Sequence, residues 1–72
     1  MKKEYLIIIE KGKNSYSAYI PDLPGCIATS DSEKNLLKLM EEGIELHIKD
    51  MKKRGYKIPL PTTKSAVIET AA

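Results

Sequence analysis

The 72-residue chain has few of the residues that usually stabilise very small proteins. It contains one cysteine and one histidine, and neither tryptophan nor phenylalanine. A single cysteine cannot form a disulfide within the chain, and these two residues cannot supply the four ligands of a structural zinc site. A chain this short has barely enough apolar surface to fold unaided. We therefore expect association with other chains to supply further stability.

Long hydrophobic runs are also missing. The run at residues 5–9 lies between Glu4 and Glu10 and is far shorter than the roughly 20 residues of a membrane span. It is also too short for the core of a signal peptide, so we expect a cytoplasmic protein. The composition, 42% hydrophobic and 31% charged with a net charge of +2, is that of an ordinary globular protein and gives little support for nucleic-acid binding.

Three strands are predicted in the first half of the chain. The apolar run at 5–9 is typical of a strand covered on both faces, and the alternating segment 15–20 follows a turn at 11–14. Residues 26–30 suit a third strand, so residues 4–30 should form a three-stranded antiparallel meander.

One long helix is predicted next. Ser32 can accept a backbone N–H at its start, and Gly55 can end it after a basic last turn. The apolar residues occupy an arc of about 200°, wider than a helix lying on one sheet requires. Gly43 lies on this arc and suggests close approach by another backbone, with simple tolerance nearly as probable.

Pro59 and Pro61 form a stiff connector to a short final strand at 65–70. A right-handed crossover would make this strand parallel to the first. We therefore predict a single α+β domain over residues 1–72, with two layers and the order βββαβ. Its apolar first strand and broad helix arc exceed what one helix can cover, so we expect a homodimer or higher oligomer. The proposed interface residues are Tyr5, Ile7, Ile9, Leu39, Gly43 and Leu46.

The stretch YIPDLPGC at residues 19–26 is a second notable feature. Pro21 ends ladder pairing, and Pro24-Gly25 fits the centre of a type II turn. Asp22 can accept a local backbone N–H or project outward as a rigidly held carboxylate.

The chain from Tyr5 to Thr70 resembles the HicB family of antitoxins. The shared pattern is aromatic-x-A-x-x-P-D-L-P-G-C, a polar turn with an aspartate, a helix, and then G-x-x-I-P-x-P. The resemblance implies a partial ribonuclease-H-like fold and a protein that covers the active site of a small basic HicA-type ribonuclease toxin. HicB antitoxins commonly carry a C-terminal DNA-binding module, and residues 1–72 leave no room for one, so we do not expect DNA binding.

The expected toxin-binding surface combines the corner with the turn after the third strand. Aspartates would face toxin cations, and an aromatic and two apolar residues would supply hydrophobic contact. The proposed residues are Tyr19, Asp22, Leu23, Pro24, Ser30 and Asp31.

Two alternatives belong to other classes of protein. A degenerate or active metal nuclease would need carboxylates converging on the first strand, where this chain has Leu6 and three isoleucines. An RNA-binding module could use a basic cluster consisting of Lys49, Lys52, Lys53, Arg54 and Lys57, but cations at a helix C-terminus also have a purely structural explanation. Cys26 and His47 are more typical of a buried core than of a nucleophile and base. We expect no enzyme activity, cofactor or metal.

Overall fold

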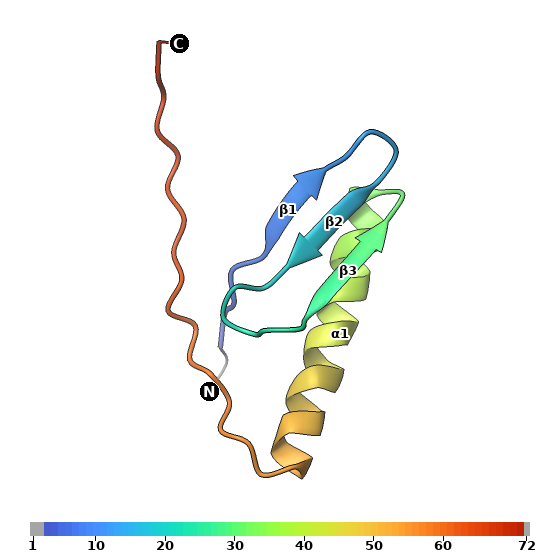
Figure 1. Ribbon diagram of the computed structural model, residues 1–72, viewed down its shortest axis with the longest axis vertical. Helices are drawn as coiled ribbons and strands as arrows, with labels where there is room; N and C mark the ends of the chain where they lie inside the picture. Colours follow the sequence, from blue (N-terminus) through green and yellow to red (C-terminus); the bar gives the residue numbers. More distant parts are fainter. Residues whose placement is uncertain (1–2, 72) are drawn as a thin grey trace.

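The computed structural model describes residues 3–71 and shows a three-stranded antiparallel sheet with one helix (Figure 1). The elements are β1 (Ile8–Lys11), β2 (Tyr16–Tyr19), β3 (Ile27–Ser30) and α1 (Glu33–Lys53), and the strand order is β1-β2-β3. The predicted α+β class, with an antiparallel meander followed by one long helix, is confirmed.

The strand register shows which residues lie on each face of the sheet. Ile9 lies opposite Ala18, which lies opposite Ala28, and the buried Ala18 identifies this row as facing α1. Ile8, Tyr19 and Ile27 form the adjacent row and therefore point to the opposite face, because successive side chains alternate. We call this opposite side the open face.

Helix α1 begins and ends where its sequence predicts. The Ser32 side chain accepts a hydrogen bond from the Asn35 backbone N–H at 3.2 Å. At the other end, Gly55 has a φ of 75°, its N–H donates to the Lys52 carbonyl, and the Tyr56 N–H donates to the Met51 carbonyl at 2.9 Å. This pair of bonds is the Schellman arrangement, which needs a residue tolerant of positive φ after the helix.

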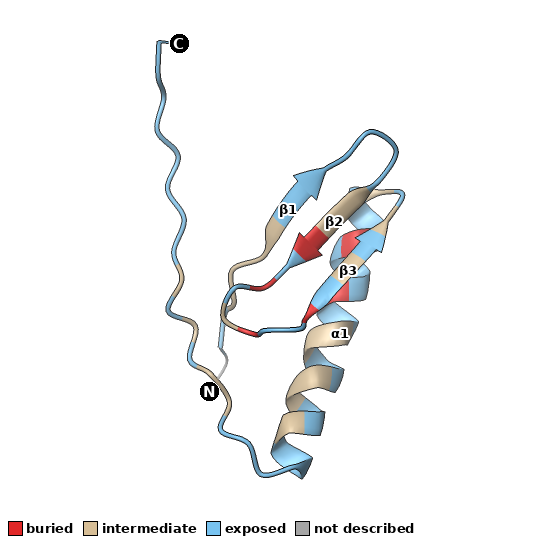
Figure 2. Cartoon of the chain, viewed as in Figure 1, coloured by how far each residue is buried: buried red, intermediate tan, exposed pale blue. Residues whose placement is uncertain are grey.

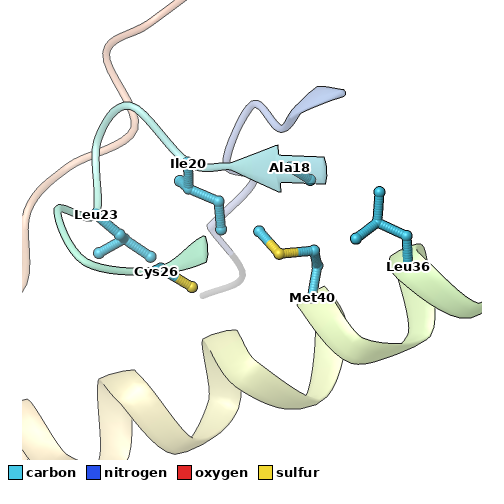
Figure 3. Packing of buried hydrophobic residues seen from close by; sticks show 6 residues of the cluster. All are labelled: Ala18, Ile20, Leu23, Cys26, Leu36 and Met40. Atoms are coloured by element: carbon cyan, nitrogen blue, oxygen red, sulfur yellow. The ribbon is translucent and has the colours of Figure 1, made fainter. Parts of the chain in front are cut away.

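The hydrophobic core lies between the helix and one face of the sheet (Figure 3). Leu36 and Met40 project from α1 toward side chains of β2 and of the corner that precedes β3. The buried residues are Ala18, Ile20, Leu23, Cys26, Leu36 and Met40. Burying a large aliphatic side chain contributes roughly 1.5–3 kcal/mol, so this small cluster supplies much of the stability.

The helix covers only part of the sheet. It contacts β2 and β3, and no contact between α1 and β1 is found within residues 3–71. Several of its apolar side chains remain exposed, including Leu46 at 68%. The wide apolar arc predicted for this helix is therefore only partly used by the chain's own sheet.

Two predicted strands differ from the structure. Of residues 5–9, only Ile8 and Ile9 belong to β1, because the segment opposite 5–7 is the corner, where Pro21 and the following turns leave no strand to pair with. Residues 65–70, predicted as a strand parallel to the first, are extended but form no strand in this structure.

We call residues 64–71 the C-terminal arm. In Figure 1 the arm runs past the sheet on the side of β1 without joining it, and Figure 2 shows it exposed throughout. Val67 and Ile68 are 98% and 85% exposed.

Candidate functional site: the proline corner and the open sheet face

The proline corner, residues 20–26, consists of two consecutive tight turns. The Leu23 N–H donates to the Ile20 carbonyl at 3.1 Å, and the Cys26 N–H donates to the Leu23 carbonyl at 3.1 Å. Pro24 and Gly25 occupy the centre of the second turn, and Gly25 has a φ of 87°, as a type II turn requires. Leu23 is buried in the core at 1% exposure. The corner is therefore fixed both by its own backbone bonds and by an apolar side chain beneath it.

Asp22 ties the corner to a distant part of the chain. One of its oxygens, Oδ2, accepts the backbone N–H groups of Thr62 at 3.1 Å and Thr63 at 3.0 Å. The other, Oδ1, accepts the hydroxyls of Thr62 at 3.2 Å and Thr63 at 2.8 Å. The N–H of Thr63 contributes most to lowering the pKa of Asp22 below its ordinary value of 3.8. Both carboxylate oxygens are thus engaged within the chain.

This long-range role of Asp22 was missed by reasoning from the sequence, which considered a local turn bond or a free carboxylate. The signal was present in the connector, where two threonines follow Pro61. An extended backbone after proline presents its N–H groups outward, and adjacent hydroxyls can join them on one carboxylate.

A second contact holds the connector. The Tyr5 hydroxyl donates to the Pro59 carbonyl at 2.5 Å. Burial, followed by the nearby negative charge of Asp22, raises the pKa of Tyr5. Residues 59–63 are therefore attached to both the N-terminal segment and the corner.

A groove with a volume of about 340 Å³ lies between the corner, the end of α1 and the connector. An ion pair between Arg54 Nε and Asp50 Oδ2, 3.0 Å apart, lies among its lining residues, and the hydrogen bond to Asp50 raises the pKa of Arg54. The lining residues are Leu23, Pro24, His47, Asp50, Met51, Arg54, Tyr56 and Pro59.

The open face carries an apolar row next to the corner. Tyr19 is 41% exposed and Ile27 is 74% exposed, and Ile8 completes the row across the three strands. The neighbouring row is polar and consists of Glu10, Ser17 and Thr29. An exposed row of this kind, bordered by polar side chains, is typical of a protein-binding surface.

The residues proposed for toxin binding do not form one cluster. Tyr19 and Pro24 are exposed near the corner, whereas Leu23 is buried. Ser30 and Asp31 lie at the opposite end of β3, where the Ser30 hydroxyl donates to Asp31 Oδ1 at 3.4 Å.

The residues proposed for the dimer interface are also spread over different surfaces. Tyr5 and Ile7 pack against the core within the chain, Ile9 is partly exposed on β1, and Leu39 and Leu46 are exposed on α1. A Cβ placed on Gly43 would meet nothing within 4 Å, so the sheet does not approach this glycine closely.

Cys26 and His47, the two residues considered as a nucleophile and base, lie in the core and at its edge. Cys26 is buried in the core, and this burial raises the pKa of its thiol. His47 is half-buried beside the groove.

Over residues 3–71, no three His, Cys, Asp or Glu side chains gather in a way that could hold a metal ion. Within residues 3–71, no helix is both long enough and apolar enough to cross a membrane.

The fold and the surface together define a small two-layer α+β protein with a rigid corner beside an exposed apolar row. A family described as "HicB_like antitoxin of bacterial toxin-antitoxin system" matches residues 5–71. The chain therefore belongs to the HicB-like antitoxin family.

Three curated proteins are similar to this chain. A UPF0150 protein of Helicobacter pylori is 39% identical over 61% of each chain, and a UPF0150 protein of Thermoplasma acidophilum is 35% identical over 78% of this chain and 83% of its own length. An uncharacterized 14.9 kDa protein of Haemophilus phage HP1, from its rep-hol intergenic region, is 33% identical over 76% of this chain and 41% of its own length. The aligned region thus spans less than two thirds of two of these relatives. No solved structure matches the chain.

Proposed function

We propose that this protein is an antitoxin that neutralises a small HicA-type ribonuclease toxin by binding over its active site. Membership of the HicB-like antitoxin family supports a toxin as the partner. The observation that carries the proposal is the apolar row Ile8–Tyr19–Ile27 on the sheet face opposite α1, in which Tyr19 and Ile27 are exposed and Ile8 is half-buried.

The open face suits a protein partner better than the carboxylate of Asp22 does. Asp22 already accepts four hydrogen bonds, and a cation of a toxin would have to compete with them. We therefore assign Asp22 to holding the corner, and we place the toxin contact on Tyr19 and Ile27. Tyrosine combines a large apolar ring with a polar hydroxyl and is enriched among residues that dominate binding energy.

Rigidity and charge favour the same face. Strand pairing and the proline corner fix the backbone around Tyr19, so little conformational entropy remains to be lost on binding. Glu10 lies in the neighbouring row of this face, and Asp31 is exposed at the end of β3. Carboxylates at the rim of an apolar contact would attract a basic toxin and orient it. Steric coverage of the toxin's catalytic groups would then be sufficient for neutralisation, without a reaction catalysed by the antitoxin.

We also propose that the protein acts as a homo-oligomer. The exposed apolar side chains of α1 and of the arm support this, since neither set is covered by the chain itself. Toxin binding and self-association would use different surfaces, the open face for the toxin and other parts of the molecule for the second copy.

The test is neutralisation of a HicA-type ribonuclease toxin, measured as inhibition of RNA cleavage and as the Kd of the complex. Ile27→Asp places a charge in the apolar row, and Thr29→Asp places the same charge on the same face of the same strand in the polar row. We expect Ile27→Asp to weaken binding by about 30-fold or more, the effect of a residue contributing roughly 2 kcal/mol, while Thr29→Asp changes it little.

Equal inhibition by the wild type and Ile27→Asp would contradict the proposed contact surface. RNA binding by the isolated protein that weakens steeply with salt, without any inhibition of the toxin, would instead favour the RNA-binding alternative.

A further inference from the structure

The two edges of the sheet differ in what lies beneath them. β1 and β3 are both edge strands, because the strand order is β1-β2-β3. Helix α1 packs against β3 and β2, whereas within residues 3–71 it makes no contact with β1. Figure 1 shows the helix continuing beyond β3 on the side away from β1. A strand added beside β3 would therefore lie over the helix, and a strand added beside β1 would not.

The hydrogen-bond pattern shows which backbone groups of β3 face its free edge. The Ile20 N–H donates to the Cys26 carbonyl at 3.3 Å, and these residues lie opposite each other in continuation of the β2–β3 register. Bonded and non-bonded pairs alternate along an antiparallel ladder. Ala28 therefore bonds to β2, while the N–H and C=O groups of Ile27 and Thr29 point away from it. Edge groups of this kind accept a further strand.

A groove beside this edge offers cover for the side chains of such a strand. It has a volume of about 340 Å³ and lies between the end of β3 and the first half of α1. Leu39, which is 45% exposed, supplies its apolar surface. On the other face of the sheet, Ile27 is exposed at the same edge. The lining residues of the groove are Ser30, Asn35, Lys38, Leu39 and Glu42. An added strand would thus meet apolar side chains on both of its faces.

The charge around the groove indicates the kind of partner. Glu42 lines the groove, and Glu41 and Glu45 line a neighbouring hollow on α1. Asp31 is exposed directly after β3, and Lys38 is the one cation lining either hollow. A second copy paired across this edge would bring the same acidic patch against itself, because a two-fold interface joins identical surfaces. A strand with basic side chains is attracted instead.

We propose that the HicA-type toxin adds one extended segment to the β3 edge as a fourth strand of the sheet. Apolar side chains of that segment lie on Leu39 on one face and beside Ile27 on the other. Its basic side chains face Glu42 and Asp31. This mode of binding rests on the proposed function and deepens it, because Ile27 joins the β3 edge to the apolar row of the open face. The backbone bonds supply affinity, and the side-chain positions supply specificity.

The first test measures amide hydrogen exchange in the full chain, free and bound to a HicA-type toxin. We expect binding to slow exchange of the Thr29 amide at least about tenfold, since its N–H then donates to the added strand. The Ile9 amide is the matched control. The bond from the Gly12 N–H to the Ser15 carbonyl sets the alternation that points the Ile9 N–H to the β1 edge, so the toxin should not change its exchange.

The second test compares two leucines of α1 by the Kd of the complex and by inhibition of RNA cleavage. Leu39→Lys and Leu37→Lys add the same charge at side chains that are 45% and 42% exposed, but only Leu39 lines the groove. We expect Leu39→Lys to weaken binding at least about tenfold and Leu37→Lys to change it little. Circular dichroism checks that both variants are folded.

A toxin that binds while the Thr29 amide exchanges as fast as before would overturn the strand addition and leave the proposed function intact. Equal affinity for the wild type and Leu39→Lys would do the same. Slow exchange of the Thr29 amide in the free protein would also overturn the strand addition, because it would show that the edge is filled without the toxin. A complete lack of toxin binding would overturn both proposals.

Discussion

Helix α1 and the C-terminal arm both carry apolar side chains, but the chain uses them very differently. The helix buries Leu36 and Met40 completely, while the arm leaves Val67 and Ile68 exposed (Figure 2). A helix satisfies its own backbone hydrogen bonds and needs only one surface to lie on. An extended segment needs both a ladder partner and cover for two faces. The comparison shows why apolar side chains are buried in the helix of this structure and exposed in its unpaired arm.

The largest effect on the free energy of unfolding is expected when two leucines of α1, one buried and one exposed, are compared. Leu36→Ala removes a side chain with no exposed surface and should lower the free energy of unfolding by about 2–5 kcal/mol. Leu46→Ala, at a position 68% exposed in the single chain, should change it by no more than about 0.5 kcal/mol at a protein concentration low enough to keep the chain monomeric. Denaturant unfolding at one fixed protein concentration measures both. A cost for Leu46→Ala as large as that for Leu36→Ala would mean that the outer side of α1 is buried in an assembly.

A smaller effect is expected where the arm is attached. Asp22→Asn keeps the shape of the side chain but replaces one acceptor oxygen by a donor, which cannot accept the N–H or hydroxyl groups of Thr62 and Thr63. Exchange of the Thr62 and Thr63 amide protons should become faster, on the order of tenfold. Asp31→Asn is the matched control and should leave these amides unchanged.

The wild type should behave like this variant in acid. The folded-state pKa of Asp22 is lowered, so the attachment is complete above the ordinary value of 3.8 and is lost as the pH falls through the lower folded-state value. The amide shifts of Thr62 and Thr63 should therefore report a midpoint below 3.8. A midpoint at or above 3.8, or no transition in these shifts, would contradict the role assigned to Asp22.

The smallest effect on the free energy of unfolding is expected when alanine replaces each of two glycines. Gly43→Ala should raise the free energy of unfolding by up to about 1 kcal/mol, because a Cβ has room there and alanine favours the helix. Gly55→Ala should lower it, by about 1 kcal/mol, because the φ of 75° strains any residue with a Cβ. Thermal unfolding distinguishes the two. If Gly43→Ala instead weakened self-association, a second chain would approach α1 at this glycine.

Several elements could be predicted from local sequence because their causes are local. Ser32 and Gly55 mark the ends of α1, and Pro24-Gly25 sets the second turn of the corner. The candidate site was less predictable. Tyr19 and Pro24 were identified and are exposed, but Leu23 is a core residue, and Asp31 lies at the other end of β3. Hydrophobicity alone does not distinguish a corner leucine that points into the core from one that points outward.

The sequence by itself determined the meander, the long helix and the rigid corner, because capping, proline geometry and side-chain alternation act over a few residues. Only the tertiary structure decided what Asp22 binds, which face of the sheet stays open and whether residues 65–70 form a strand. The first depends on a contact 40 residues away, the second on the strands that α1 covers, and the third on a ladder partner, which residues 65–70 do not have in this structure.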